Sequence, residues 1–292
     1  MNNLFARFDR EARLMIMAAA AVVALVGAVW FAFLAAQNRE TTPLRPSVAE
    51  NAPLPPLAAP KAEEPAPEQA APARGGRGEI ETTLARTPEI GRFFGRLRDT
   101  LPGEYQNIMA KLAARKDIDG ANPDLLLSEG VKLLRQSRGA LAAKASDEKL
   151  ANIFQKQLVV MEALQKQDAR ACVDFLYGGA SADLFRLSAA NRDAVSDLAL
   201  AGLDAILSGE QKKIVRSAPT DADFQQLEGG LQRAGLAKPE IEALLDGKTP
   251  SPPLPDARMC KAGVVYLETL SVMPPEARLR IYALAIDMMA RT

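Results

Sequence analysis

The sequence predicts an all-α protein with one membrane anchor, and three observations support this prediction. Residues 14–36 carry no charge, and residues 37–79 are rich in proline and alanine. From residue 80 onward, apolar residues recur three and four positions apart, and no alternating Val/Ile/Thr-rich run predicts a strand. We therefore expect a cytoplasmic tail at 1–13, a transmembrane helix at 14–36, a disordered linker at 37–79 and a bundle-like domain of about nine helices at 80–292.

The uncharged run at 14–36 is long enough to cross a membrane. At a rise of about 1.5 Å per residue, its length matches a hydrocarbon core of about 30 Å. The alternative is a cleavable signal peptide, but its apolar region is typically about 7–15 residues. Leu34 would also stand three residues before a cut after Ala36, where a small residue is needed. We expect an uncleaved signal-anchor, which makes the chain a single-pass membrane protein.

The charges around this span favour a cytoplasmic N-terminus. Three arginines precede the span, whereas Arg39 and Arg45 follow it soon after. The alanine-rich composition is typical of bacterial proteins. We therefore expect the chain in the bacterial inner membrane, with its C-terminal domain in the periplasm.

The linker at 37–79 contains nine prolines and no aromatic residue. Proline removes backbone donors and fixes φ, so neither helix nor sheet propagates through such a segment. The composition also offers too little apolar surface to offset the entropy of ordering. The segment is interpreted as a passive spacer, with a docking site for a proline-binding groove as the alternative.

Helix start signals recur along the C-terminal domain. Thr87 and Pro88 suit a cap and a first helical position, and similar signals stand at 122–124, 146–148 and 274–275. Short helices are also expected at 80–86 and 239–246. The apolar residues of the segment after Ser146 follow one helical face: Leu150, Ile153, Phe154, Leu158, Met161 and Leu164. The residues at 80–292 can share one core, although a division into two lobes near 247–256 is the alternative.

Composition excludes several classes of function. Lys plus Arg and Asp plus Glu both number 36, so the net charge is zero and no nucleic-acid partner is expected. Histidine is absent, which excludes a Ser-His-Asp triad, a Cys-His pair and a His-ligated metal. Two cysteines alone cannot complete a zinc site. We expect neither a metal nor a cofactor.

The two cysteines stand in nearly repeated phrases, DARAC at 168–172 and DARMC at 256–260. Asp is a preferred N-cap, and Asp256 follows Pro255, so we expect Asp256 to cap a helix that carries Cys260. Cys172 has the same spacing from Asp168. The alternative for the first phrase is one unbroken helix over 147–177. In either case both cysteines lie on apolar helix faces.

Three interpretations of the cysteine pair are open: a structural disulfide, two buried free thiols, or a reactive pair. We favour a disulfide between Cys172 and Cys260, because the number is even and the periplasm is oxidising. Such a bridge would tether the last two helices, with an effect of roughly 4–5 kcal/mol in the chain-entropy model.

No catalytic residue is assigned. The candidate carboxylates Glu104, Glu129, Asp174 and Glu268 show no spacing that differs from a solvated helix face. Ser128 and Lys132 lie one helical turn apart, which is too common a spacing to indicate a catalytic dyad. We therefore expect a binding role, as an envelope scaffold, adaptor or accessory protein with an envelope protein partner. A carboxylate-dependent hydrolase or lyase acting on the cell wall is the alternative.

Overall fold

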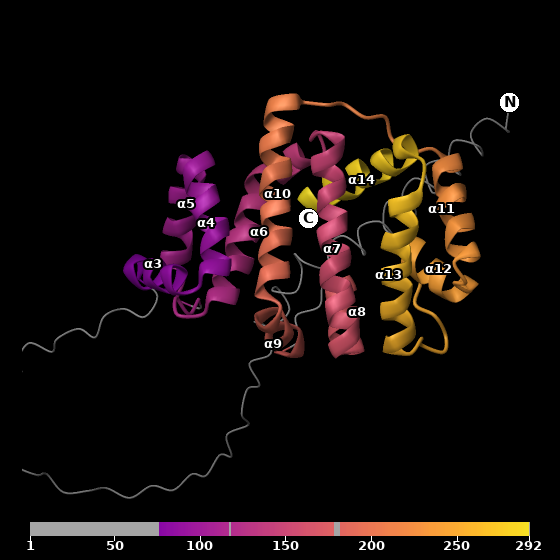
Figure 1. The fold of residues 1–292 in the computed structure, drawn as a ribbon, viewed down its shortest axis with the longest axis horizontal. Coiled ribbons are helices and arrows are strands. Elements are labelled where there is room, and N and C mark those ends of the chain that lie inside the picture. Colours follow the sequence, from indigo (N-terminus) through magenta and orange to yellow (C-terminus); the bar gives the residue numbers. More distant parts are fainter. Residues whose placement is uncertain (1–75, 117, 178–181, 292) are drawn as a thin grey trace, which may run out of the picture.

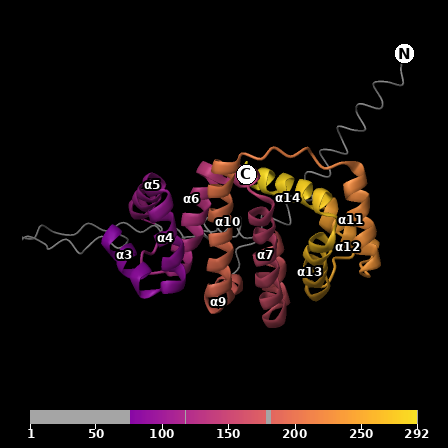
Figure 2. The same ribbon diagram turned by 45° about the horizontal axis from the view of Figure 1, so that its top comes forward.

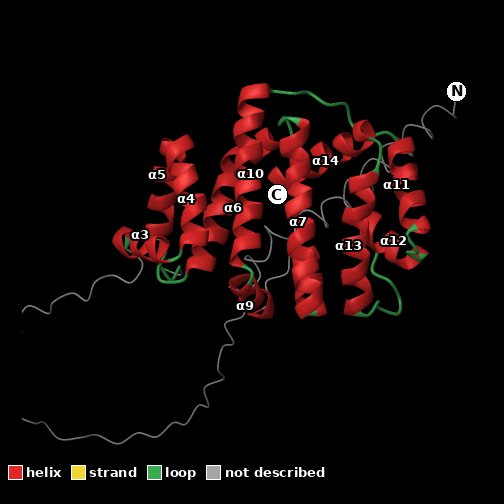
Figure 3. Ribbon diagram, viewed as in Figure 1, coloured by secondary structure: helices red, strands yellow, loops and turns green. Residues whose placement is uncertain are grey.

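The computed structural model describes residues 76–116, 118–177 and 182–291. This part of the chain contains helices and loops and no strand (Figure 3), which confirms the all-α prediction. The helices are α3 (Arg77–Arg86), α4 (Pro88–Thr100), α5 (Pro102–Ala114), α6 (Pro123–Ala142), α7 (Asp147–Gln167), α8 (Ala169–Tyr177), α9 (Ala182–Ala190), α10 (Arg192–Lys212), α11 (Asp221–Arg233), α12 (Lys238–Leu245), α13 (Asp256–Val272) and α14 (Pro275–Ala290).

Twelve helices lie in the described residues, so the expectation of about nine was too low. No start had been named for α5, α9 or α11. The signal for α11 was present, because Thr220 and Asp223 form a capping box with reciprocal bonds of 3.3 and 2.8 Å. By contrast, α5 follows Leu101, which offers no side-chain cap.

The helical region begins earlier than expected, since α3 starts at Arg77 and the linker was placed up to 79. The predicted membrane span at 14–36 and nearly all of the linker lie outside the described residues. Among the helices that are described, none combines the length and apolar character that a membrane crossing requires.

The helices form an elongated array in which neighbours pack side by side. Figures 1 and 2 show α3, α4 and α5 at one end, α11 and α12 at the other, and α6, α10, α7 and α13 between them. Helix α10 packs against α4, α6 and α7, while α13 packs against α7, α8, α11 and α12. Helix α14 crosses this row and packs against α6 and α7.

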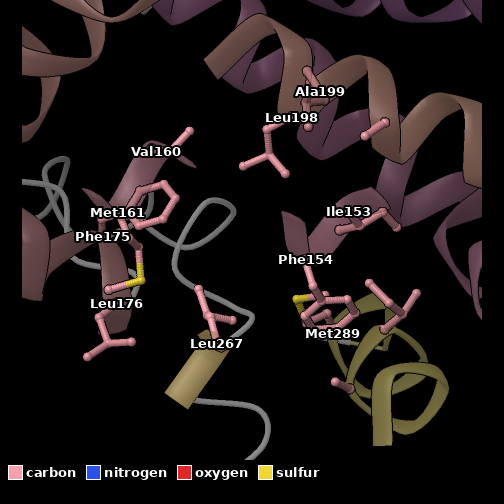
Figure 4. Packing of buried hydrophobic residues seen from close by; sticks show 14 of the residues in the cluster. Ile153, Phe154, Val160, Met161, Phe175, Leu176, Leu198, Ala199, Leu267 and Met289 are labelled. Carbon is pink, nitrogen blue, oxygen red and sulfur yellow. The ribbon is translucent and has the colours of Figure 1, made fainter. Parts of the chain in front are cut away.

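The buried apolar residues form one cluster that runs from Ile80 in α3 to Met289 in α14. It continues across the segment 247–256, where a division into two lobes had been considered. Figure 4 shows part of this cluster, with side chains from α7, α8, α10, α13 and α14 facing one another: Ile153, Phe154, Val160, Met161, Phe175, Leu176, Leu198, Ala199, Leu267 and Met289.

Several expected helix starts occur where the sequence placed them. Asn122 accepts a hydrogen bond from the Leu125 amide (3.1 Å), and Ser146 accepts one from the Lys149 amide (3.5 Å). Thr87 is the N-cap residue of α4 but makes no capping bond through its side chain. Proline residues occupy the first turns of α4, α6 and α14, where their missing N–H costs nothing.

The two Asp residues of the DARxC phrases differ in role. At Asp168 the backbone turns to φ −159° and ψ 113°, which ends α7. The Asp168 Oδ1 accepts bonds from the amides of Arg170 (2.8 Å) and Ala171 (3.1 Å), so this residue starts α8. The alternative of one unbroken helix is therefore wrong. The expected cap at Asp256 is also wrong: Pro255 is the N-cap residue of α13, without a side-chain bond, and Asp256 is already helical.

An extended segment at 213–220 connects α10 to α11 across the α6–α7 corner. The Ile214 amide donates to the Lys144 carbonyl (3.0 Å). The Arg216 guanidinium donates to the carbonyls of Ala143 (3.0 Å) and Ala145 (2.7 Å) and to Asp147 (2.6 Å). We call this segment the strap. Its bonds fix the end of α10 to the start of α7.

Candidate functional site

The carboxylates considered for catalysis lie on four different helices, α5, α6, α8 and α13. Glu104 on α5 accepts bonds from Ser137 (2.9 Å) and Arg138 (3.1 Å) of α6. Buried Glu129 pairs with Arg115 and lies 3.7 Å from the Lys132 amine. The bonds to Glu104 and the Arg115–Glu129 pair join neighbouring structural elements, as stabilising ion pairs do, while the Lys132–Glu129 pair lies within α6.

Asp174, Glu268 and the Ser128–Lys132 pair lie on three different helices, α8, α13 and α6. Asp174 pairs with Arg170 at 3.2 Å on the same helix, and its Oδ2 is buried without a hydrogen bond in the structure. Glu268 is exposed on α13. The Lys132 amine forms an ion pair with Glu129, at 3.7 Å.

The structure places Cys172 and Cys260 together as a disulfide with a Cα–Cα distance of 5.5 Å. Both cysteines are fully buried, and the bridge joins α8 to α13. Arg170 and Asp256 also approach each other across these helices, at 3.7 Å. The two DARxC phrases therefore meet in space, although only Asp168 of the two aspartates caps its helix.

An apolar hollow lies between α4, α6, α7, α10 and α14. It encloses about 40 Å³. Its lining is almost entirely carbon: Phe93, Leu134, Gly139, Ala142, Ile153, Leu198, Ala199, Gly202, Leu203, Ile206, Ile286, Met289 and Ala290, with Arg135 as the one charged residue. We call this hollow the Arg135 cavity.

Arg135 is unusual because it is a charged residue on the apolar face of α6. Only 5% of its surface is exposed, and burial lowers the pKa of its guanidinium to about 10. The group still carries its proton near neutral pH, so a positive charge lies beside an apolar cavity. The attraction between this charge and an anion is stronger there than in water, because the surroundings are less polarisable.

A second hollow lies on the other side of Arg135, at the surface. This pocket of about 430 Å³ has Arg135, Gly139 and Ala290 in common with the cavity and adds polar residues, among them Glu104, Ser137 and Arg138. Gly139 stands at the contact between α6 and α14: a Cβ there would lie 2.9 Å from Arg135 Cγ and 3.1 Å from Ala290 Cβ. Glycine thus allows α14 to close over the arginine.

The sequence analysis did not identify Arg135 as a candidate. The signal was available in the helical period, because Leu127, Val131 and Leu134 mark an apolar face and Arg135 lies on it, four positions after Val131. A single charged residue on an apolar helix face does not by itself indicate a functional site. The cavity beside it requires helices that are far apart in the sequence.

Comparison with known proteins gives no assignment. No protein-family model matches the chain, and neither the curated proteins nor the solved structures contain a match. Within the described residues, no group of His, Cys, Asp or Glu is placed to hold a metal ion.

Proposed function

We propose that the chain is a membrane-anchored binding protein whose helical domain acts in the bacterial periplasm as an envelope scaffold, adaptor or accessory subunit. The observation that carries this proposal is that three of the candidate carboxylates take part in ion pairs. Glu104, Glu129 and Asp174 lie in ion pairs with arginine or lysine, whereas the enclosed site is lined by carbon and one arginine. A hydrolase of the cell wall would need two carboxylates that face each other across a cleft.

Two further features support the location and the role. A disulfide between core helices suits an oxidising compartment outside the cytoplasm. The helices form an elongated array (Figure 1), as those of extended helical scaffolds do. The apolar run at 14–36 and the proline-rich linker would hold this surface at a distance from the membrane.

The proposal is tested by site-specific photo-crosslinking in intact cells. The crosslinking residue replaces Val159, Val215 or Val272, one at a time, because these side chains are exposed by 49%, 87% and 82% and make little contribution to the core. They lie on α7, on the strap and at the end of α13. We expect one envelope protein to be captured at one or two of the three positions and to rebind the purified full-length chain.

The enzymatic alternative is tested with the same preparation. Purified full-length protein is incubated with isolated cell-wall material, and soluble fragments are measured. We expect no release. Fragment release that is lost on Glu129→Gln or Asp174→Asn, together with no crosslinked partner at any position, would overturn the proposal in favour of a carboxylate-dependent hydrolase.

A further inference from the structure

Helices α11 and α12 lie at one end of the array, with a non-helical connector on each side of them (Figures 1 and 2). The strap precedes α11, and residues 246–255 follow α12. Helix α11 packs against α13 and α14, and α12 packs against α13. We propose that α11 and α12, here called the lid, open as one unit and that the face of α13 beneath them binds an acidic amphipathic helix. This inference rests on the proposed binding role, and it names the surface and the chemistry of the partner segment.

Two arginines hold the lid closed. Arg280 of α14 donates to both oxygens of Asp223 in α11, at 2.9 and 2.7 Å. Arg258 of α13 donates to Glu240 in α12 through Nε, at 2.9 Å. In the described part of the chain, these are the two ion pairs that join the lid to other helices. Both carboxylates are buried, so an opening of the lid would free two guanidinium groups at the same time.

The lid covers one face of α13. A Cβ on Gly230 of α11 would lie 2.6 Å from the Thr269 Cγ2, so the two helices meet closely at this point. Arg258 and Ala262 precede Thr269 by eleven and seven positions, and the helical period puts all three on the same face. Tyr266, three positions before Thr269, borders this face and is fully buried. We call this side of α13 the covered face, and opening of the lid would expose it.

The opposite face of α13 is anchored independently of the lid. Cys260, nine positions before Thr269, lies half a helical turn away from the covered face and is bonded to Cys172 of α8. On the same side, a Cβ on Gly263 would lie 2.7 Å from the Met161 Cε, so α13 packs closely against α7. These contacts would keep α13 in place when the lid opens.

The helix that fits the covered face is defined by α11. Leu227 and Leu231 follow Asp223 by four and eight positions, so the three residues lie on one side of α11, and all three are buried. Recognition of a helix in a groove uses anchors with this spacing. A partner helix that carries a carboxylate followed by two large apolar residues would replace these contacts. A basic helix would leave Arg258 and Arg280 without a carboxylate, which is costly for charges that are partly buried.

Hydrogen exchange on the full-length protein in detergent tests whether the lid opens by itself. We expect the amides of α11 and α12 to share one protection factor, at least tenfold lower than that of α7, because the lid opens without unfolding the rest of the array. Equal protection of α11, α12 and α7 would show that the lid opens only in global unfolding, and it would overturn the proposal.

A labelled peptide that copies residues 219–236 is the probe for the covered face, and fluorescence anisotropy measures its binding to the full-length protein. The double variant Asp223→Asn with Glu240→Gln loosens the lid and leaves both arginines in place. We expect it to bind the peptide at least tenfold more tightly than the wild type does. The double variant Arg258→Gln with Arg280→Gln breaks the same two ion pairs but removes the guanidinium groups. It should bind the peptide at least tenfold more weakly than the first variant.

The matched control is Asp221→Asn with Glu228→Gln, which removes two exposed carboxylates from α11 and should bind the peptide as the wild type does. If a double variant fails to fold, the single changes Asp223→Asn and Arg280→Gln replace the two variants with the same expectations. Binding by the lid variant that is no tighter than in the control would show that the covered face does not accept a helix. Equal binding by the lid variant and the arginine variant would remove the role of the charge. The crosslinking test of the proposed function is independent of these results, because it asks whether a partner is captured and not whether the lid opens.

Discussion

Arginine–carboxylate pairs between helices help to fix the arrangement of the helices in the array. Arg192 of α10 holds Asp124 of α6 with two bonds of 2.9 and 2.7 Å. Arg258 of α13 pairs with buried Glu240 of α12. The Arg192–Asp124 pair is bidentate and fixes orientation as well as distance, because the planar guanidinium must align with both carboxylate oxygens.

The ion pair between Asp223 and Arg280 makes the clearest pH-dependent contribution to stability. Its carboxylate accepts two bonds from Arg280, at 2.9 and 2.7 Å, and one from the Thr220 amide. These bonds lower the pKa of Asp223 to about 2, with Arg280 as the main cause. Because the pKa is lower in the folded protein, the ionised carboxylate stabilises the fold at pH values above about 3.9, the pKa of Asp in the unfolded chain. This contribution is lost as the pH falls through about 2.

Replacement of Asp223 by Asn should therefore destabilise the protein in a pH-dependent way. We expect a loss of about 1–3 kcal/mol in the free energy of unfolding near neutral pH, because the Arg280 guanidinium loses its charged partner. The difference from wild type should shrink as the pH falls from about 4 to about 2. Urea unfolding between these values checks it. Asp221→Asn, at an exposed neighbour, is the control, and a difference that did not vary with pH would contradict the account.

The cysteine pair gives a second prediction at the scale of residues. Cys172→Ser and the double change of Cys172 and Cys260 to Ser should lower the free energy of unfolding by similar amounts, since one bridge is lost in both. The chain-entropy model gives about 4–5 kcal/mol for a separation of 88 residues. Thermal or urea unfolding of the oxidised proteins measures it. A wild-type stability that did not change on addition of reductant would show that the bridge is absent.

At the scale of elements, the packing of α10 against the α6–α7 corner organises the middle of the array. A Cβ on Gly209 would lie 1.8 Å from the Leu141 carbonyl oxygen, so only glycine permits this approach of α10 to the end of α6. The strap then crosses the same corner and is held by Arg216. The contact at Gly209 and the hydrogen bonds of Arg216 therefore stabilise the same junction, where α10 and the strap meet the α6–α7 corner.

Arg216→Gln should loosen this junction. The carbonyls of Ala143 and Ala145 lose a charged donor, and we expect a loss of about 1–3 kcal/mol in the free energy of unfolding. Hydrogen exchange should become faster at the Ile214 amide, which is bonded to Lys144. Lys212→Gln is the control, since Lys212 is exposed at the end of α10. Exchange at Ile214 that stayed as slow as in wild type would show that Arg216 does not hold the strap.

The helices themselves were largely predictable, because apolar spacing and caps are local signals. Asn122 and Ser146 begin helices as expected, while Asp256 does not cap because α13 begins one residue earlier than that prediction required. The break at Asp168 was left open, since the apolar phase continues across it. Arg135 could not be interpreted from sequence alone, because its cavity is formed by helices from α4 to α14.

At the scale of the whole molecule, the packed helical part is expected to be separable from the N-terminal segments. Limited proteolysis of detergent-solubilised protein should cut first between residues 40 and 76 and release a stable fragment of about 23 kDa, because extended proline-rich chain is accessible to proteases. Mass spectrometry of the fragments locates the cuts. Early cleavage within α6 or α10, with residues 40–76 protected, would show that the linker packs against another surface.

The disulfide between Cys172 and Cys260 supports the proposed location of the helical domain outside the cytoplasm, because cytoplasmic thiols are kept reduced. The disulfide is tested by alkylating full-length protein taken from cells at once and without reductant, followed by mass spectrometry of the peptides that contain Cys172 and Cys260. We expect that neither thiol is modified and that the two peptides are recovered linked within one chain. Alkylation of both cysteines in unfolded, unreduced protein would contradict it and leave two ordinary core thiols.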